Sequence, residues 1–300
     1  MTQPLRAAAL GFFDGVHRGH AALLRQTVRI AGEMGLRPAA LTFAGHPRAL
    51  VGGGAPPLLM SQDERGARIR ALGIEEIVFL TFDERFASLP PEQFVTDVLL
   101  DAYRCGAVVT GENYRFGKGA AGTPRLLRDM GDRLGFRAVL CPAVTQDGVG
   151  ISSTRIRALI EAGEVERAAS LLGRPFALSG EIVHGRHVGR RLGFPTINVL
   201  PPGEIVMPRG GVYAARVAIG GETWPAVTNI GVRPTFTSEG PVTIESHLLG
   251  FQREVYHDTA SVQFLRFLRD EQAFASPELL RQQIARDAQS ALRAQHEVKL

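Results

Sequence analysis

The stretch from Leu10 to His20 (Leu-Gly-Phe-Phe-Asp-Gly-Val-His-Arg-Gly-His) constrains the fold of this chain most strongly. An apolar run leads into Gly11, and an amphipathic run over 21–34 follows the second histidine. This order predicts a strand, a tight glycine turn and a helix. Because the free N–H groups at a helix N-terminus favour anions, the turn is a candidate phosphate site. His17 and His20 are three residues apart, so both imidazoles can reach one ligand and neutralise charge on an attacked triphosphate. The alternative is a pair of surface histidines beside a structural turn.

The first half of the chain alternates apolar runs with helical patterns. The expected strands are 6–10, 38–43, 76–80, 107–110 and 137–141, and the expected helices are 18–34, 62–72, 91–104 and 123–134. Such alternation predicts a parallel sheet covered on both faces, with ligands bound beyond the carboxyl ends of the strands. The glycine–histidine turn follows the first of these strands.

The hydrophobic periodicity of the sequence changes near Phe176, where helical patterns end. Short runs with glycine and proline punctuation predict an antiparallel barrel with strands at 178–183, 211–219, 224–230, 242–248 and 260–267. A terminal helix follows, with Ser276 as its N-cap and Pro277 at its first position. Its expected apolar stripe is Leu280, Ile284, Ala288 and Leu292. The join near 172–176 predicts two domains, 1–174 and 175–300.

The composition excludes several classes of protein. Hydrophobic residues make up 45% and charged residues 21% of the 300, as in an ordinary globular protein. No apolar run approaches the roughly 20 residues of a membrane span, and the N-terminus lacks a signal-peptide pattern, so we expect a cytoplasmic protein without a membrane partner. The net charge of +4 comes from dispersed arginines, so we expect no nucleic-acid partner. Two cysteines are too few for a disulfide framework or a zinc site.

Two further segments of the first half carry polar groups suited to a nucleotide. Ser152, Ser153 and Thr154 precede a helical pattern that contains Arg157, and hydroxyls with arginines at a helix start make a second phosphate cradle. The alternative is an ordinary serine-capped helix. Asn113 follows an expected strand and is a candidate to orient the nucleotide or a magnesium-bound water.

The second half carries its own candidate site. Between residues 180 and 198, several glycines permit close backbone approach to phosphates. Thr196 and Asn198 are two residues apart, so both fall on one face of an extended segment and offer hard oxygen ligands to magnesium. The alternative is a glycine-rich hairpin with a polar edge. Glu245 alternates with apolar neighbours on an expected strand and is a candidate functional carboxylate. The alternative is an ordinary glutamate on the barrel surface.

Together these motifs resemble those of bacterial bifunctional riboflavin kinase/FAD synthetases. The first stretch is similar to the G-x-F-D-G-x-H-x-G-H signature of the nucleotidyltransferase superfamily, and residues 151–157 are similar to its I-S-S-T-x-x-R motif. Residues 180–198 resemble the kinase block G-x-x-x-G-R-x-L-G-F-P-T-A-N, and residues 229–235 match N-I-G-x-R-P-T. The resemblance covers about residues 5 to 290.

The resemblance implies an α/β fold with a Rossmann-like nucleotidyltransferase domain and a parallel sheet, followed by an antiparallel β-barrel riboflavin kinase domain with a terminal helix. It implies that the barrel phosphorylates riboflavin to FMN with ATP and Mg²⁺, and that the first domain adenylylates FMN to FAD and releases pyrophosphate. Riboflavin, FMN and ATP are then substrates, and FMN and FAD are products rather than prosthetic groups. We expect a monomer or a transient oligomer.

The resemblance also assigns roles to residues. His17 and His20 assist adenylyl transfer, and Glu245 is the general base for the riboflavin 5′-hydroxyl. Thr196 and Asn198 bind the metal. The nucleotide and phosphate set is Gly11, Phe13, Asp14, Gly15, Asn113, Ser153, Thr154, Arg157, Gly185, Gly189 and Arg190, and the flavin or flap set is Asn229, Arg233, Thr235 and Arg269. For Asp14, loop geometry, nucleotide contact and magnesium positioning stay open.

The chain departs from the family pattern at a few positions. Gly45 replaces a proline and loosens the turn that carries His46, Ile197 replaces an alanine, and Gly250 replaces an aspartate. These departures motivate one alternative, an enzyme with one inactive half. A second alternative is a flavin-sensing protein that binds without turnover.

Overall fold

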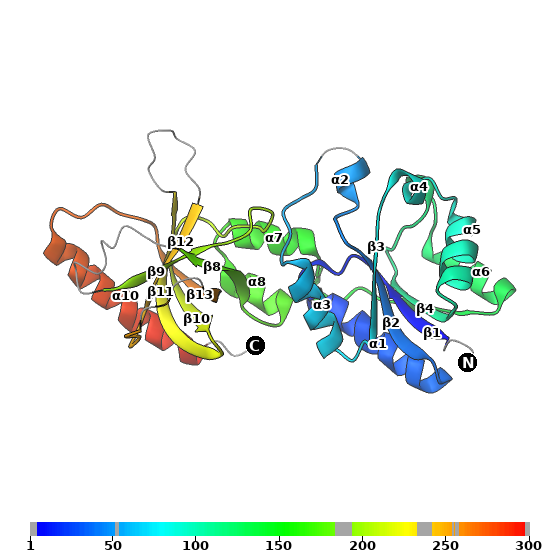
Figure 1. Cartoon of the computed structure of the whole chain (residues 1–300), viewed down its shortest axis with the longest axis horizontal. Helices are drawn as coiled ribbons and strands as arrows, with labels where there is room; N and C mark the ends of the chain where they lie inside the picture. Colours follow the sequence, from blue (N-terminus) through cyan, green and yellow to red (C-terminus); the bar gives the residue numbers. More distant parts are fainter. Residues whose placement is uncertain are drawn as a thin grey trace. The chain divides into compact units, whose positions relative to one another are not determined.

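The computed structural model describes residues 5–51, 54–183, 194–232, 242–253, 255 and 258–297. Contacts divide the chain into two compact units, Met1–Ser153 and Thr154–Leu300, whose elements are drawn in Figure 1. This division falls earlier than the boundary expected from the sequence, because a helix before residue 174 contacts barrel strands of the second unit. The assignment of domains 1–174 and 175–300 stays a prediction.

The first unit contains a five-stranded parallel sheet in the order β3-β2-β1-β4-β5. Its strands are β1 (Arg6–Leu10), β2 (Arg37–Phe43), β3 (Glu76–Leu80), β4 (Cys105–Gly111) and β5 (Arg137–Cys141). The bounds of β1, β3 and β5 are those expected from the sequence, and β2 and β4 are slightly longer. Because the strand order reverses between β1 and β4, a crevice opens at their carboxyl ends, where such sheets bind ligands.

Helices cover both faces of this sheet. The helical segments of this unit are α1 (Arg18–Met34), α2 (Arg48–Val51), α3 (Gln62–Ala71), α4 (Glu84–Ala87), α5 (Pro91–Gln93), the π-helical segment η2 (Phe94–Ala102) and α6 (Pro124–Leu134). The unit also has the short turns η1 (Asp14–Val16) and η3 (Lys118–Ala120) and the hairpin of β6 (Thr145–Gln146) and β7 (Val149–Gly150). The expected helix 91–104 is thus a short α-helix continued by a π-helix.

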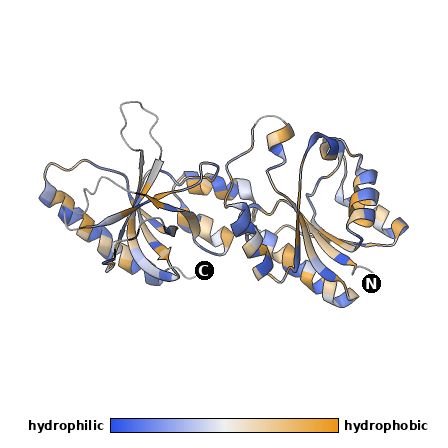
Figure 2. Ribbon diagram, in the orientation of Figure 1, coloured by the Kyte–Doolittle hydropathy of each residue, from blue (hydrophilic) through white to orange (hydrophobic). Residues whose placement is uncertain are grey.

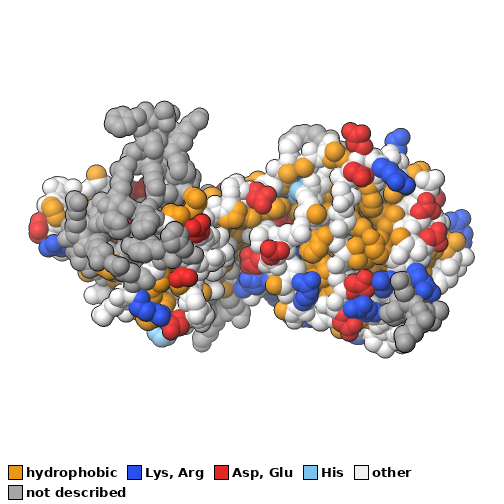
Figure 3. All heavy atoms as spheres, in the orientation of Figure 1, with side chains coloured by type: hydrophobic (Ala, Val, Ile, Leu, Met, Phe, Trp, Pro, Cys, Tyr) orange, Lys and Arg blue, Asp and Glu red, His pale blue; other side chains and the backbone are white. Residues whose placement is uncertain are grey.

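Alternate residues of β1 contribute to two separate cores. Ala7 and Ala9 pack in a cluster with α1 and α3, whereas Ala8 and Leu10 pack in a cluster with η2 and α6. In Figure 2 the strands of this sheet are mostly orange, and its helices carry both blue and orange residues. At the edge of the sheet, β3 is only partly buried, and Figure 3 shows hydrophobic side chains on the visible face in its region.

The second unit contains helices α7 (Ser153–Glu161, whose first residue the division assigns to the first unit) and α8 (Val165–Leu172), a barrel and a terminal helix. The six barrel strands are antiparallel and close in the order β10-β11-β12-β9-β8-β13. They are β8 (Phe176–Val183), β9 (Thr196–Leu200), β10 (Gly211–Ile219), β11 (Glu222–Val232), β12 (Val242–Leu248) and β13 (Thr259–Arg269). The antiparallel barrel and terminal helix α10 (Pro277–Glu297) confirm the expected architecture. Strand β9 was not among the strands expected from the sequence.

The outer face of β10, β11 and β13 is covered by α10. Val212, Val227 and Leu265 pack there against Ala291 and Ala294. The expected stripe was therefore wrong at its C-terminal end, since Leu292 is 47% exposed. Small side chains, which carry little hydrophobic signal, let the helix approach the barrel closely. The helix begins as expected, with the Leu279 amide donating to Ser276 Oγ at 3.3 Å.

Candidate active sites

The first candidate site is a pocket of about 350 Å³ in the first unit, at the carboxyl ends of β1 and β4. It therefore lies at the point where the strand order reverses. Its wall includes both expected catalytic histidines, His17 and His20, and four of the residues expected to bind nucleotide or phosphate: Gly11, Phe13, Asn113 and Ser153. Four segments, around residues 11–20, 111–114, 141–144 and 151–153, thus meet in one place. Thr154 and Arg157 lie on α7 and are not part of this wall.

The loop from Gly11 to His17 has a strained backbone. Phe13 has φ 57° and Val16 has φ 39°, values that β-branched and bulky residues rarely adopt. Gly11 is required next to this ring, because an added Cβ would lie 2.8 Å from Phe13 Cε1. Strain of this kind persists only where the surroundings fix the backbone, and it is commonest at functional sites.

The two histidines occupy defined positions at the start of α1. His17 is the N-cap, and its Nδ1 accepts a hydrogen bond from the His20 amide at 3.3 Å. A neutral His17 ring therefore carries its proton on Nε2, which is a hydrogen-bond donor. The two rings stack with centroids 3.6 Å apart. Burial and the neighbouring His17 hold the pKa of His20 well below its usual value, so His20 is neutral at pH 7.

The Asp14 carboxylate lies in the loop interior rather than in the pocket wall. It is 2% exposed, and its Oδ1 accepts a hydrogen bond from the Leu59 amide at 2.9 Å. The carbonyl of Asp14 accepts from Ser153 Oγ at 2.9 Å, so Ser153 is fixed next to the turn. Gly15 is also buried, with φ 79°. These contacts favour loop geometry among the three roles left open for Asp14.

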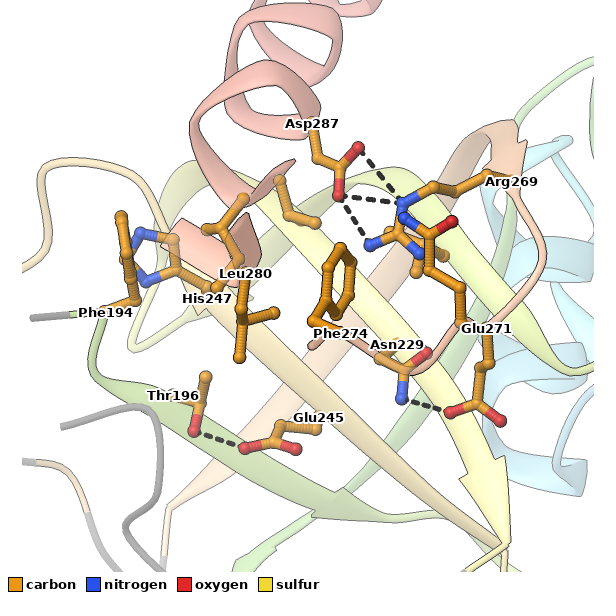
Figure 4. A pocket seen from close by; sticks show the side chains of 14 residues that line it. Phe194, Thr196, Asn229, Glu245, His247, Arg269, Glu271, Phe274, Leu280 and Asp287 are labelled. Carbon is orange, nitrogen blue, oxygen red and sulfur yellow. Dashed lines mark hydrogen bonds and ion pairs between the residues drawn. The ribbon is translucent and has the colours of Figure 1, made fainter. Parts of the chain in front are cut away.

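The second candidate site is a pocket of about 330 Å³ in the second unit (Figure 4). It lies on the outer face of the barrel and is bounded by α10 and the segment that follows β13. Of the residues expected in the kinase site, its wall includes Thr196, Asn229, Glu245 and Arg269. One side is apolar, with Val212, Val227, Phe274, Leu280 and Ile284.

Strand register assembles the polar centre of this pocket. Glu245 on β12 lies between Asn229 on β11 and Asn198 on β9, and opposed residues share a face of the sheet. Thr196, two residues before Asn198, donates its hydroxyl to Glu245 Oε1 at 2.6 Å. Asn198 is 8% exposed and is not in the pocket wall. Ile197 is opposite the buried Ser246, so it points away from Glu245.

Arg269 is held by the terminal helix. Its guanidinium makes several hydrogen bonds to the Asp287 carboxylate, the shortest at 2.8 Å, and Gln283 donates to the same carboxylate at 2.8 Å. On the other side of the pocket, Asn229 Nδ2 donates to Glu271 Oε1 at 2.7 Å. Figure 4 shows both pairs beside the Phe274 ring.

Some expected residues lie outside the described part of the chain, namely Gly185, Gly189, Arg190, Arg233 and Thr235. Several wall residues were not among the expected site residues: Glu112 and Cys141 in the first pocket, and Phe194, His247, Glu271, Phe274 and Asp287 in the second. Cys141 had a usable signal, because it ends an expected strand at the ligand-binding edge. Glu112 also had a local signal, because it precedes Asn113 directly after an expected strand, as did Phe194 inside the quoted kinase block and His247 two residues after Glu245. Glu271, Phe274 and Asp287 come into the pocket through the packing of α10 and of the segment after β13, which no local motif reveals.

Comparisons with known proteins agree with the two pockets. Residues 2–155 match the FAD synthetase family, and residues 172–295 match the riboflavin kinase family. The bifunctional riboflavin kinase/FMN adenylyltransferase of Pseudomonas fluorescens is 36% identical over 284 residues, which cover 95% of this chain and 91% of the relative. Its namesake from Escherichia coli K12 is 37% identical, with 94% and 90% covered.

A solved structure is similar over almost the whole chain. The crystal structure of a macrolide-efflux protein from Streptococcus pneumoniae matches with a TM-score of 0.90 and 30% identity, covering 97% of this chain and 95% of that one. Efflux is the description of that protein alone. In the part of this chain that the structure describes, no helix is long and apolar enough to cross a membrane.

An α/β unit with a glycine–histidine loop at the carboxyl ends of its strands, followed by a barrel with a carboxylate-centred pocket, is the architecture of a two-part nucleotide-dependent transferase. The matches to FAD synthetase and riboflavin kinase, in that order, specify the two reactions. The chain belongs to the family of bifunctional riboflavin kinase/FMN adenylyltransferases. It is an enzyme of flavin biosynthesis that makes FMN from riboflavin and FAD from FMN.

Proposed function

We propose that the barrel pocket is where riboflavin is phosphorylated and that the pocket at the carboxyl ends of β1 and β4 is where FMN is adenylylated. The hydrogen bond between Thr196 and Glu245, inside a pocket with one apolar side, is the observation that supports the kinase assignment best. A flat aromatic ring fits the apolar side. The polar end then receives the ribityl chain, whose terminal hydroxyl is the group to be phosphorylated.

Glu245 acts in this proposal as the general base. Thr196 occupies one carboxylate oxygen and fixes its direction, which leaves the other oxygen to accept the proton of the 5′-hydroxyl. The hydroxyl oxygen bonds to the γ-phosphorus of ATP as the bond to the ADP oxygen breaks. Arg269, fixed by Asp287, is at the opposite end and orients the polar edge of the flavin.

Magnesium binding by Thr196 and Asn198 is also a proposal. Hydroxyl and amide oxygens beside a carboxylate are the hard donors that Mg²⁺ prefers. Within the described residues, no cluster of three or more His, Cys, Asp or Glu side chains forms a metal site by itself. The ion would therefore share the ATP phosphates and water as ligands, and when bound it neutralises charge on the transferred phosphoryl group.

In the first pocket, catalysis is positioning and charge stabilisation. An FMN phosphate oxygen bonds to the α-phosphorus of ATP, and the bond to the pyrophosphate oxygen breaks. The N-terminus of α1 and the Nε2–H of His17 are the groups that we propose to stabilise the phosphate oxygens. Neutral His20 supports His17 by stacking, and Ser153 completes the far side of the pocket. Thr154 and Arg157 keep their expected phosphate role as a proposal.

A chromatographic time course on variants tests both assignments. Glu245→Gln should abolish FMN formation from riboflavin and leave FAD formation from FMN intact, whereas His17→Asn should do the reverse. Glu222→Gln, which alters an exposed carboxylate at the start of β11, is the matched control and should keep both rates. A Glu245→Gln enzyme that still phosphorylates riboflavin contradicts the assignment of the base. Tight flavin binding without ATP consumption by the unaltered chain would favour the binding-protein alternative.

The cytoplasmic location, the absence of a nucleic-acid partner and the monomeric or transiently oligomeric state also remain proposals. Sedimentation of the full chain with and without flavin and ATP tests the last of these, since a stable oligomer at all concentrations would contradict it.

A further inference from the structure

Arg65 is a buried cation that belongs to neither pocket wall. It lies on α3 and is 3% exposed, although charged side chains are almost never buried without strong partners. Burial lowers the pKa of its guanidinium, and the nearby Asp14 opposes that shift. Keeping a charged group at this depth costs free energy, so its contacts must be strong.

The contacts of Arg65 join two loops. Its Nη1 donates to the Phe12 carbonyl at 3.1 Å, and its Nη2 donates to the Phe43 carbonyl at 2.6 Å and to the Ala44 carbonyl at 3.4 Å. The guanidinium carbon also lies 4.3 Å from the centre of the Phe12 ring. Phe12 is in the loop after β1, and Phe43 ends β2. A planar fork is suited to bridging several acceptors at once, which a lysine ammonium does less well.

Two neighbouring hydrogen bonds act on the same loop. Thr42 Oγ1 donates to the same Phe12 carbonyl at 3.0 Å. The Leu59 amide, just before α3, donates to the Asp14 carboxylate at 2.9 Å. The loop is therefore fixed on both sides of Phe13, and this explains how Phe13 and Val16 keep their strained backbone angles.

We propose that Arg65 is a positioning residue for FMN adenylylation. Arg65 donates to the carbonyls of both Phe12 and Phe43 and so links the Gly11–His17 loop to the end of β2. This link keeps the loop in the conformation that directs His17 and the N-terminus of α1 toward the nucleotide phosphates. Arg65 contacts no substrate in this proposal. The proposal rests on the proposed function of the first pocket.

The test compares Arg65→Gln and Arg65→Lys in the full chain. Arg65→Gln should lower kcat for FAD formation by about 100-fold, the effect expected of a small misplacement of reacting groups. KM for FMN should change much less, because Arg65 does not line the pocket. Arg65→Lys should restore part of the lost rate. Riboflavin phosphorylation by the same molecules should be unchanged, which provides an internal control.

Two further variants keep the result interpretable. Arg68→Gln removes a partly buried arginine three residues along α3, which pairs with Glu64 and contacts neither Phe12 nor Phe43, and should change neither activity. Thr42→Val removes only the second donor to the Phe12 carbonyl, so it should lower kcat for FAD formation less than Arg65→Gln does. It also tests the role of the Phe12 carbonyl in the event that Arg65→Gln does not fold.

The outcomes separate this proposal from the proposed function. If His17→Asn abolishes FAD formation while Arg65→Gln and Thr42→Val keep the full kcat, the role of Arg65 is overturned and the site stands. If His17→Asn itself leaves FAD formation unchanged, the site assignment fails. Equal losses in both activities would mean that Arg65 serves only general stability, and this too overturns the proposal.

Discussion

Removal of the Asp287 charge should destabilise the barrel by an amount that the structure allows us to work out. The Asp287 side chain is 6% exposed and that of Arg269 is 21% exposed, so this ion pair is mostly buried. Breaking a fully buried pair costs about 3–5 kcal/mol, whereas an exposed pair contributes about 0–1 kcal/mol. Since Arg269 keeps partial access to water and asparagine keeps the shape of the site, we expect Asp287→Asn to cost about 2–3 kcal/mol.

The chain provides its own probe for this measurement. Trp224 is the one tryptophan in the sequence and lies on β11, so its fluorescence follows unfolding of the barrel in urea. With a slope of about 1–3 kcal/mol per molar urea, the Asp287→Asn midpoint should fall by roughly 1 M. Asp270→Asn, which breaks the exposed pair with Arg209, should shift it little. An Asp287→Asn midpoint equal to that of the unaltered chain would refute the reasoning.

Two further predictions concern a glycine and a histidine. Gly180→Ala should destabilise the barrel, because its Cβ would lie 2.1 Å from the Leu200 carbonyl oxygen, whereas Gly203→Ala meets open space and should be tolerated; the fluorescence midpoint separates them. Folding lowers the pKa of His20. Below about pH 6.5, His20 is therefore protonated in the unfolded chain and still neutral in the folded chain. The free energy of unfolding should fall as the pH drops from about 6.5 toward the folded pKa. Between pH 7 and pH 5, the melting temperature should fall less for His20→Gln than for the unaltered chain. Equal falls for the two proteins would contradict this.

Periodicity in the sequence was enough to predict most elements of the fold. Strand β1 and helix α1 have the bounds expected, because an apolar run, a glycine turn and an amphipathic run signal them locally. Strand β9 was interpreted only as an extended metal-binding segment, since five residues bounded by prolines carry little strand signal. Asp287 was not assigned to the site, because a carboxylate on the buried side of a helix looks like a break in its apolar stripe. Its partner Arg269 is 18 residues away in sequence, and only the packing of α10 on the barrel brings them together.

Site residues that belong to one continuous motif could be placed together from the sequence more readily than residues that strand register brings together. The first motif placed His17 and Gly11 in one loop, and the structure places both in one pocket wall. The role of Arg65 gave no such signal, because its partners are main-chain carbonyls, which any sequence supplies.

The pairing of β13 with both β8 and β10 has a consequence for synthesis on the ribosome. The α/β sheet is complete once Cys141 has emerged, whereas without β13 the other barrel strands form an open sheet with free edges on β8 and β10. Free edges of this kind invite pairing with other nascent chains. Because domains fold from the N-terminus as they emerge, the half that makes FAD is finished before the half that supplies its FMN. The edges of β8 and β10 stay exposed until β13 (Thr259–Arg269) has been synthesised and pairs with both.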